Sequence, residues 1–506
     1  MLDSPLLPVH SPSSTVLFNS YIFILVFLPL VVIGFFLFSH FKLFQLSIAW
    51  LTVASLFFYG YWNIYYLPLL LFSITFNYLL GRNIEAQTTK SKKSQGLLFL
   101  GILVNLGLLG YYKYTNFFLN SLNQGLNFQF NLAQVILPLA ISFYTFTQIA
   151  FLVDAYYGKT KNCQYNFLSY SFFVSFFPQL IAGPILRYNE LLPQLKDKSI
   201  FAFSQKNFTM GVTLFILGLS KKVLVADNLS PWVNGVFSNP FDSTFLEAWV
   251  GTIAYTFQLY FDFSGYSDMA IGLAWMFNLQ LPINFNSPYK ATSIIDFWRR
   301  WHITLSHFLR DYLYIPLGGN RQGKIRQYIN LLITMLLGGL WHGAGWNFVV
   351  WGGLHGVFLV VNNVGNKFNI TMTKLVSWLL TFLIVVLSWV IFRAPNLQEG
   401  FILLKTMLGL NGLVLPTAYQ SFIPSISSDW ITFQSWLDFQ YLPAIGLHKT
   451  ILILFVILII VTQSPNTQEI MNSFQPKRWF AYTISLLAVL CLLSLNQVSE
   501  FLYFQF

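Results

Sequence analysis

Charged residues are scarce in this chain of 506 residues, of which only 9% are Asp, Glu, Lys or Arg. Because soluble globular domains carry roughly 25% charged residues, the composition excludes an ordinary soluble protein. Crossing a bilayer takes about 20 apolar residues, and uncharged stretches of this length recur at Leu43–Gly81, Ser94–Tyr112, Met269–Tyr289, Gln327–Asn366, Leu375–Phe392 and Trp479–Ser499. We predict an all-α, polytopic membrane protein with about 11–13 transmembrane helices.

Cysteine is also rare, since the chain contains only Cys163 and Cys491. Two cysteines exclude a disulfide framework and a thiolate metal site, and both are expected to be small buried hydrophobes. The sequence also has no His-x3-His pair, Gly-x-Ser-x-Gly elbow, phosphate loop or dinucleotide fingerprint. We therefore predict no metal site and no permanently bound cofactor.

Residues 1–17 are rich in Ser and Pro and contain no Lys or Arg. A secretory signal would begin with a basic segment and end at a small-residue cleavage site. We therefore predict a loose N-terminal tail over 1–17 and a single membrane domain over 18–506, with Phe18–Ser39 as an uncleaved first span.

The net charge of +11 is distributed unevenly along the chain. Arg82–Lys93 has four basic residues and one acidic residue, and Lys290–Arg326 has seven basic residues and two acidic ones, whereas Thr406–His448 has no Lys or Arg. The positive-inside rule places the first two segments in the cytoplasm and the third outside. The positive charge thus reflects topology and predicts no nucleic-acid partner. We expect 282–326 to be a cytoplasmic amphipathic or re-entrant segment and 397–448 to be extracytoplasmic.

Two apolar stretches do not fit a simple span. Leu168–Leu186 contains Pro178 and Pro184, which break helices. Tyr266–Leu281 would place the basic Lys290–Arg326 segment on the wrong side if it crossed the membrane fully. Irregular backbone at membrane depth is tolerated only when it is packed in protein or lines a cavity, so we predict re-entrant or half-membrane segments at both places.

Ser293–Ser306 is predicted to form one amphipathic helix at the membrane interface. Ser293 is a plausible N-cap, with Asp296 at the third helical position. Asp296 precedes Arg299 by three residues and Arg300 by four, so the charges can pair along one helix face. These three charged residues are therefore expected to support the helix structurally, and the helix should end before the turn-forming run that begins at Pro316.

His342 lies within Gln327–Asn366, a run without charged residues. A histidine at membrane depth must be satisfied by a partner, a water-filled cavity or a substrate. A functional role and a hydrogen bond across helices therefore both stay open. His355 follows 13 residues later, about 220° around a continuous helix, and is expected to be structural. His302 alone would be an ordinary interfacial histidine.

Several segments together resemble the membrane-bound O-acyltransferase (MBOAT) superfamily, in particular its bacterial branch of alginate and polysaccharide O-acetylation proteins. The resemblance rests on Phe261–Ala270, Pro282–Tyr289, Asp296–Ser306, Arg310–Gly319 and Leu340–Ala344. Supporting pieces are Gln179–Ile185, Lys221–Asn228 and Trp389–Ala394. The match runs from about residue 17 to about residue 400, and it contains an ordered pair of histidine motifs.

The resemblance implies a thinned core with a central catalytic funnel, in which His342 is catalytic and His302 is the second active-site histidine. Neutral imidazole, with a pKa of about 6.5, suits general-base catalysis. His342 would take the proton of the acceptor hydroxyl, while His302 would orient the acyl group or stabilise the oxyanion. The residues expected to bind substrate are Trp341, Trp301, Ser306, Asn286 and Asp262. From the residues alone, however, Asp262 and Asp268 are each as well explained by a bond to a backbone end or a basic residue.

The function predicted from this resemblance is transfer of an acyl group, most simply acetyl, across the bacterial inner membrane for O-acetylation of an exported or cell-wall polysaccharide. The expected partners are the lipid bilayer, an acyl donor (acetyl-CoA or an acylated carrier protein) and a periplasmic acetyltransferase of the SGNH type. Two alternatives stay open: transfer of D-alanyl or another acyl group from a carrier protein, and a transporter or scaffold subunit of a polysaccharide-export complex. The sequence also leaves open whether His302 and His342 share one site.

Overall fold

The computed structural model describes residues 17–126, 130, 135–161, 163–181, 183–422, 430–443, 445–475, 477–495 and 502. Apart from residue 17, the predicted N-terminal tail lies outside these residues. Seven described helical segments are long and apolar enough to cross a membrane, namely Phe23–His40, Phe44–Trp62, Ile64–Glu85, Lys92–Leu126, Gln205–Phe237, Trp346–Lys367 and Lys374–Arg393. They confirm the predicted polytopic helical class.

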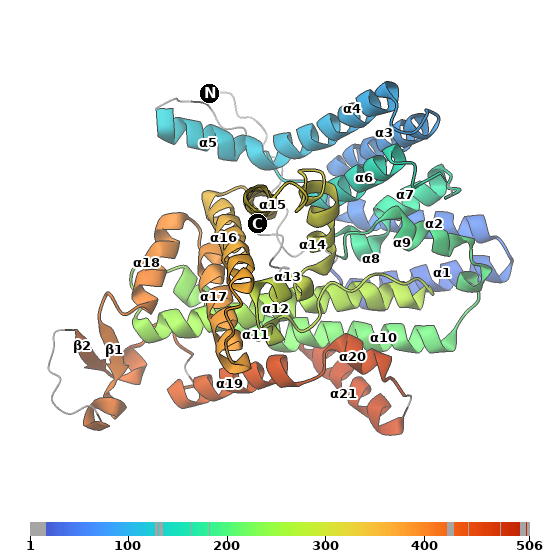
Figure 1. Ribbon diagram of the computed structural model, residues 1–506. Coiled ribbons are helices and arrows are strands. Elements are labelled where there is room, and N and C mark those ends of the chain that lie inside the picture. Colours follow the sequence, from blue (N-terminus) through green and yellow to red (C-terminus); the bar gives the residue numbers. More distant parts are fainter. Residues whose placement is uncertain are drawn as a thin grey trace, which may run out of the picture.

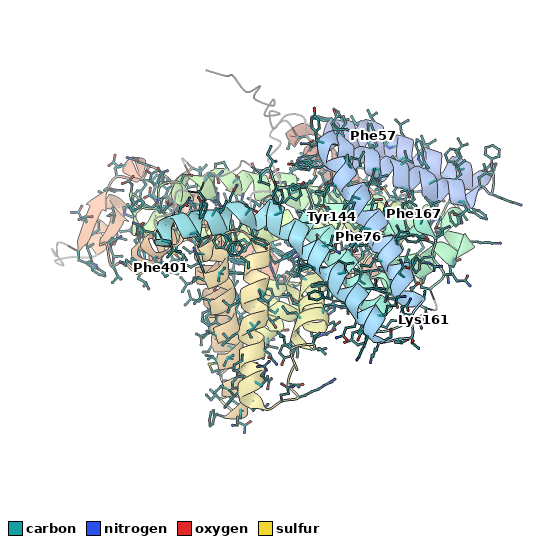
Figure 2. The ribbon with its side chains drawn as sticks, turned by 90° about the horizontal axis from the view of Figure 1, so that it is seen from above. Phe57, Phe76, Tyr144, Lys161, Phe167 and Phe401 are labelled. Atoms are coloured by element: carbon teal, nitrogen blue, oxygen red, sulfur yellow. The ribbon has the colours of Figure 1, made fainter. Side chains whose placement is uncertain are left out.

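Four of the N-terminal helices lie together at one side of the molecule, whereas the fifth continues the fourth and extends away from them (Figure 1). They are α1 (Leu28–His40), α2 (Phe44–Trp62), α3 (Leu67–Glu85), α4 (Lys92–Leu109) and α5 (Thr115–Leu126). A π-helical turn, Gly110–Tyr114, joins α4 to α5. Apolar side chains such as Phe57 and Phe76 lie along the outer helices (Figure 2), and Phe57 is 59% exposed. Such a surface suits contact with lipid.

Shorter helices follow and pack between the N-terminal helices and the centre. They are α6 (Ile141–Tyr156), α7 (Phe167–Ser175), α8 (Phe177–Leu180) and α9 (Tyr188–Leu191). The helical chain breaks at Phe176, directly before the first turn of α8, which contains Pro178. The predicted interruption of Leu168–Leu186 is therefore present, and Tyr170–Ser175 of α7 and all of α8 are buried.

The centre is formed by α10 (Gln205–Ser220), α11 (Asp227–Phe237) and α12 (Phe245–Met276). The structure corrects the prediction of a separate half-membrane segment over Tyr266–Leu281, because α12 runs unbroken for 32 residues. Its two internal carboxylates are neutralised by neighbouring lysines: Lys222 lies 2.7 Å from Asp262, and Lys221 lies 2.6 Å from Asp268. Paired in this way, the acidic residues do not interrupt the buried helix.

Glycines let α10 and α12 approach closely. A Cβ atom at Gly218 would lie 2.5 Å from the carbonyl oxygen of Gly265, and one at Gly211 would lie 2.6 Å from that of Gly272. Small residues at such crossings bring two backbones into contact, which is how membrane helices pack without a hydrophobic driving force. The same helix α12 reaches the histidine motifs through Phe263, whose ring packs edge-on against that of His302.

The part of the chain that follows α12 carries the two histidine motifs (Figure 1). It comprises α13 (Ile294–Arg300), α14 (Ile303–Leu309), α15 (Lys324–His342), α16 (Trp346–Lys367) and α17 (Lys374–Arg393). The predicted single helix over Ser293–Ser306 is therefore two helices, broken at Trp301 and His302. Trp301 is extended, and His302 has a positive φ of 43°, a conformation that is uncommon outside glycine.

The remaining elements lie at the edge. They are α18 (Leu397–Met407), β1 (Leu413–Pro416), β2 (Ile431–Gln434), α19 (Leu447–Gln463), α20 (Thr467–Asn472) and α21 (Arg478–Ser494). The two strands pair in parallel, with Leu413 opposite Ile431. This small sheet, which the sequence did not predict, lies in the 397–448 segment and beside α18 in Figure 1.

Candidate active site

His302 and His342 meet in the interior of the protein. Their ring centroids are 6.3 Å apart, with an angle of 66° between the ring planes. The residues are 0% and 4% exposed, respectively. His302 lies at the break between α13 and α14, and His342 is the last residue of α15. The structure thus brings together the two histidines whose proximity the sequence left open.

The end of α15 is held by two residues from the turn between α4 and α5. The Lys113 ammonium donates to the carbonyl oxygens of Trp341 (2.6 Å) and His342 (3.1 Å), and the Tyr114 hydroxyl donates to that of Leu340 (2.8 Å). The last carbonyls of a helix have no partner within the helix, and a cation there also complements the helix dipole. Lys113 and Tyr114 therefore fix the backbone that carries His342.

Close packing of α15 against α16 places an aromatic ring on His342. A Cβ atom at Gly339 would lie 2.2 Å from the carbonyl oxygen of Phe348, and one at Gly352 would lie 2.2 Å from that of Met335. The helices are therefore in backbone contact. Trp351 consequently packs edge-on against the His342 ring, with centroids 5.2 Å apart.

The backbone around His302 is organised by Asn284. The Asn284 side-chain oxygen lies 3.2 Å from Nδ1 of His302 and accepts hydrogen bonds from the backbone N–H (3.3 Å) and hydroxyl (2.9 Å) of Thr304. Its main-chain carbonyl accepts from the Ile303 N–H at 3.0 Å. The His302 side chain makes no cap bond to α14, so Asn284 takes over that role. On its other side, His302 meets the edge of Phe263.

Trp341 joins the histidine pair to a separate aromatic cluster. Phe146 of α6 stacks on Trp341, with centroids 5.1 Å apart, and on Phe308 of α14, with centroids 4.1 Å apart. The Trp341 ring also lies 6.1 Å from that of His302. Of the residues predicted to bind substrate, Trp341 is thus the one with a ring contact to both histidines.

The other predicted substrate-binding residues have partners elsewhere. Asp262 pairs with Lys222, the Asn286 amide oxygen accepts from Asn466, and Ser306 makes a long bond, 3.5 Å, to the carbonyl oxygen of Trp301. Trp301 itself packs against a ring set comprising Phe285, Tyr289, Phe297 and Trp389. Their roles in binding substrate stay predictions: Asp262 and Trp301 are buried in the core, Ser306 is half-buried and Asn286 is exposed.

His355 lies nearer to the pair than the sequence indicated. The expectation that it faces away from His342 assumed a continuous helix, but α15 ends at His342 and α16 begins at Trp346. Trp351 lies between the two histidines, with its ring 5.2 Å from that of His342 and 4.9 Å from that of His355. The Trp298 indole donates to Nδ1 of His355 at 3.3 Å. His355 therefore contacts Trp351, the same ring that packs on His342.

The charged residues of α13 adopt part of the predicted arrangement. The Ser293 hydroxyl caps the helix by accepting from the Asp296 N–H at 3.1 Å, and Asp296 pairs with Arg300 at 2.8 Å. Arg299 is exposed. Asp296 and Arg300 therefore contribute to holding α13, which leads into the break at His302.

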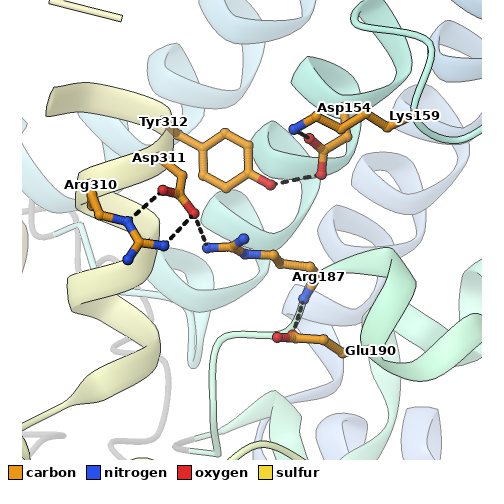
Figure 3. A network of polar contacts seen from close by, with 7 residues as sticks. All are labelled: Asp154, Lys159, Arg187, Glu190, Arg310, Asp311 and Tyr312. Atoms are coloured by element: carbon orange, nitrogen blue, oxygen red, sulfur yellow. Dashed lines mark hydrogen bonds and ion pairs between the residues drawn. The ribbon is translucent and has the colours of Figure 1, made fainter. Parts of the chain in front are cut away.

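A polar network ties the π-helical segment Arg310–Tyr314, which follows α14, to α6 and to the residue before α9 (Figure 3). The Tyr312 hydroxyl donates to Asp154 at 2.7 Å, and Arg187 pairs with Asp311 at 2.6 Å. Burial alone would raise the pKa of Asp311, but hydrogen bonds from Arg310 and Arg187 hold that pKa below its usual value. Because Tyr312 also packs on Phe308, this network continues the aromatic cluster beside the site.

The chemistry available at the site comes from imidazole, indole and amide groups. Within the part of the chain that the structure describes, no group of three or more His, Cys, Asp or Glu side chains could hold a metal ion. Cys163 and Cys491 are both unpaired. Two adjacent buried imidazoles can accept, hold and return a proton, which is the requirement of general acid–base catalysis.

Sequence reasoning missed Lys113, Tyr114 and Asn284. Lys113 directly follows the uncharged run Ser94–Tyr112, where a lone lysine is usually taken as a boundary residue that snorkels to the interface. Asn284 lay inside a motif of the resemblance but had no assigned role. Their partners are remote in sequence, so only the fold reveals their contacts.

The chain is similar to known proteins over most of its length. Residues 161–398 match the model of the membrane-bound O-acyltransferase family. A peptidoglycan O-acetyltransferase of Helicobacter pylori is 47% identical over 79% of this chain and 81% of its own length. The "probable alginate O-acetylase" of Pseudomonas aeruginosa is 43% identical over 77% of this chain and 74% of its own length. A teichoic acid D-alanyltransferase of Bacillus subtilis is 27% identical over 48% of this chain and 62% of its own length.

Proposed function

Because this chain belongs to the membrane-bound O-acyltransferase family, we propose that it moves acetyl groups to the hydroxyls of an exported or cell-wall polysaccharide. It is an O-acyltransferase and a multi-pass protein of the bacterial inner membrane. The polysaccharide class follows from the names of its relatives at 43% and 47% identity, which concern alginate and peptidoglycan. These polymers share sugar hydroxyls as the group to be acetylated.

The observation that carries the proposal is the 6.3 Å separation of the His302 and His342 rings. A substrate hydroxyl bound beside this pair would form a hydrogen bond of about 2.8 Å to an imidazole nitrogen. One imidazole takes the hydroxyl proton as the oxygen attacks the carbonyl carbon of a thioester. The carbon–sulfur bond then breaks, and the imidazolium returns the proton to the departing thiolate.

The acyl donor in this proposal is a thioester, either acetyl-CoA or an acetylated carrier protein. The basic segment Lys290–Arg326, predicted to be cytoplasmic, supports delivery from that side. A periplasmic acetyltransferase of the SGNH type is the proposed partner that completes transfer to the sugar. The 27% identity to a teichoic acid D-alanyltransferase makes D-alanyl transfer the alternative outcome of a donor test.

The test compares His302→Ala and His342→Ala with His40→Ala, which alters an exposed histidine at the end of α1. Base-released acetate from the purified cell-wall or exported polysaccharide would be measured in cells with matched protein levels. We expect acetylation to fall by at least about 10²-fold in both core variants, as is usual when a general base is lost. His40→Ala should be unaffected.

Retained acetylation in His342→Ala would overturn the proposal. The donor is assigned by incubating the purified protein with radiolabelled acetyl-CoA, an acetylated carrier protein or a D-alanylated carrier protein. Transfer from the last of these alone would establish the alternative.

A further inference from the structure

The two ring nitrogens of His302 have different surroundings. Nδ1 lies 3.2 Å from the side-chain oxygen of Asn284. Nε2 is buried and, among the residues that the structure describes, has no hydrogen-bond partner. A buried polar atom without a partner costs free energy unless something else satisfies it. In a site that binds a substrate, Nε2 is thus the atom left for that substrate.

The orientation of the Asn284 amide follows from its other contacts. The Thr304 backbone N–H can only donate, and it points to the same Asn284 atom at 3.3 Å. The Thr304 hydroxyl oxygen accepts from the Ile185 N–H at 3.0 Å, so its hydrogen is free to point to Asn284, 2.9 Å away. The Asn284 atom that receives these bonds must therefore be the oxygen. Because an amide oxygen cannot donate, Nδ1 of His302 must carry the hydrogen of that contact.

We infer that Asn284 is a positioning residue that holds neutral His302 in the Nδ1–H form. Its Nε2 atom then presents a lone pair and acts as the hydrogen-bond acceptor for the attacking hydroxyl. This inference deepens the proposed function and rests on it. It also excludes stabilisation of the oxyanion by His302, because a neutral ring of this form cannot donate a hydrogen bond from Nε2.

The proton can be followed through the reaction. It leaves the acceptor hydroxyl for Nε2 of His302 while that oxygen bonds to the thioester carbonyl carbon. The positive imidazolium keeps its Nδ1–H bond to the Asn284 oxygen. When the carbon–sulfur bond breaks, the Nε2 proton passes to the thiolate, and the neutral Nδ1–H ring is restored. The resemblance gave the base role to His342, whereas the hydrogen bonds of His302 assign proton acceptance to His302.

Asn284 also caps α14, so its loss affects folding as well as the proposed tautomer. Three variants separate the two effects. Asn284→Asp keeps an acceptor oxygen for both Nδ1–H and Thr304, and Asn284→Leu removes it. Asn105→Leu is the matched control, because Asn105 is likewise 1% exposed and its side chain bonds to Asn77 of α3, away from the site.

The first measurement is the kinetics of acetyl transfer by each full-length variant, normalised to the monodisperse folded fraction. Loss of an orienting acceptor beside a catalytic imidazole costs about 10²–10⁴-fold in kcat. We expect Asn284→Leu to show such a loss with KM for the acetyl donor little changed, and Asn284→Asp to stay within about 10-fold of the native kcat. Asn105→Leu should lower stability and leave the kcat of its folded fraction unchanged.

The second measurement determines the tautomer of His302 directly and does not depend on enzymatic activity. Nitrogen NMR of ¹⁵N-histidine-labelled protein in bilayers, with His302→Gln as the assignment control, should give a protonated Nδ1 and an unprotonated Nε2 for His302. A protonated Nε2 in the native protein, or an unchanged kcat in folded Asn284→Leu, would overturn the inference. Retained acetylation in His302→Ala would likewise overturn it, whereas a native protein that transfers no acetyl group to polysaccharide would overturn the proposed function instead.

Discussion

The ammonium group of Lys113 lies 3.1 Å from the carbonyl oxygen of His342. This contact joins the turn between α4 and α5 to the C-terminal end of α15, although the two segments are far apart in sequence. It is buried, and it satisfies carbonyls that the helix itself cannot satisfy. The position of the His342 backbone in the site therefore depends on a residue from a distant part of the sequence.

Replacing Lys113 with Met should lower both stability and activity. Each buried carbonyl left without a donor costs about 1–3 kcal/mol, and the end of α15 would be free to shift. We expect a lower Tm in detergent and at least about 10-fold slower acetyl transfer, since small misplacements at an active site are costly. Lys93→Met, at an exposed position in the first turn of α4, is the control. An unchanged rate in Lys113→Met would show that the contact does not position His342.

Gly339→Ala should disrupt the packing of α15 on α16. The added Cβ would lie 2.2 Å from a backbone oxygen, that of Phe348, so rotation of a side chain cannot relieve the clash. Overpacking of this kind costs about 1–3 kcal/mol or more. Thermal unfolding in detergent should reveal the loss. In contrast, Gly107→Ala in α4, where a Cβ would meet nothing within 4 Å, should be neutral or stabilising because alanine favours helix. Equal Tm values for the two variants would contradict the backbone contact.

The ion pairs of Asp311 should make stability depend on acid pH. Its pKa is lowered in the folded state, where Arg310 and Arg187 outweigh the opposing effect of burial. This contribution is therefore present above the unfolded pKa of about 4 and is lost as pH falls through the lower folded value. Asp311→Asn should have a lower Tm than the native protein at about pH 7, with the difference shrinking below about pH 4. A difference that stays constant across this range would argue against the pairing.

The helical membrane class could be predicted from composition because lipid requires long uncharged stretches, and these are visible in the sequence. The unbroken course of α12 could not be predicted in the same way. The half-membrane prediction for Tyr266–Leu281 came from the side on which the basic segment Lys290–Arg326 was expected to lie, and that topology argument does not reveal an unbroken helix. Asp262 and Asp268 were expected to bond a backbone end or a basic residue, but their partners, Lys222 and Lys221, come from the π-helical segment after α10 and are identified only by its packing on α12. Charged residues in an apolar stretch thus indicate that their side chains are buried, but their ion-pair partners can be identified only from the fold.

The two histidine motifs were recognisable in the sequence, but their local backbone was not. The pattern of Ser293–Ser306 fits one helix, and nothing within it predicts the positive φ of His302. The break is stabilised by Asn284, whose oxygen atoms receive the donors at the start of α14. Similarly, the relative facing of His342 and His355 was misjudged because the assumed continuous helix is broken between α15 and α16.

The most direct test of the central claim is a double-mutant comparison of His302→Ala, His342→Ala and the combined variant. Acetyl transfer by each purified protein would be measured in proteoliposomes as kcat/KM. Residues that act as a unit in one site have strongly non-additive effects. The 6.3 Å separation of the rings predicts that the combined variant is no slower than the slower single variant. Losses that multiply, or a single variant with native kcat/KM, would contradict a shared acyl-transfer site.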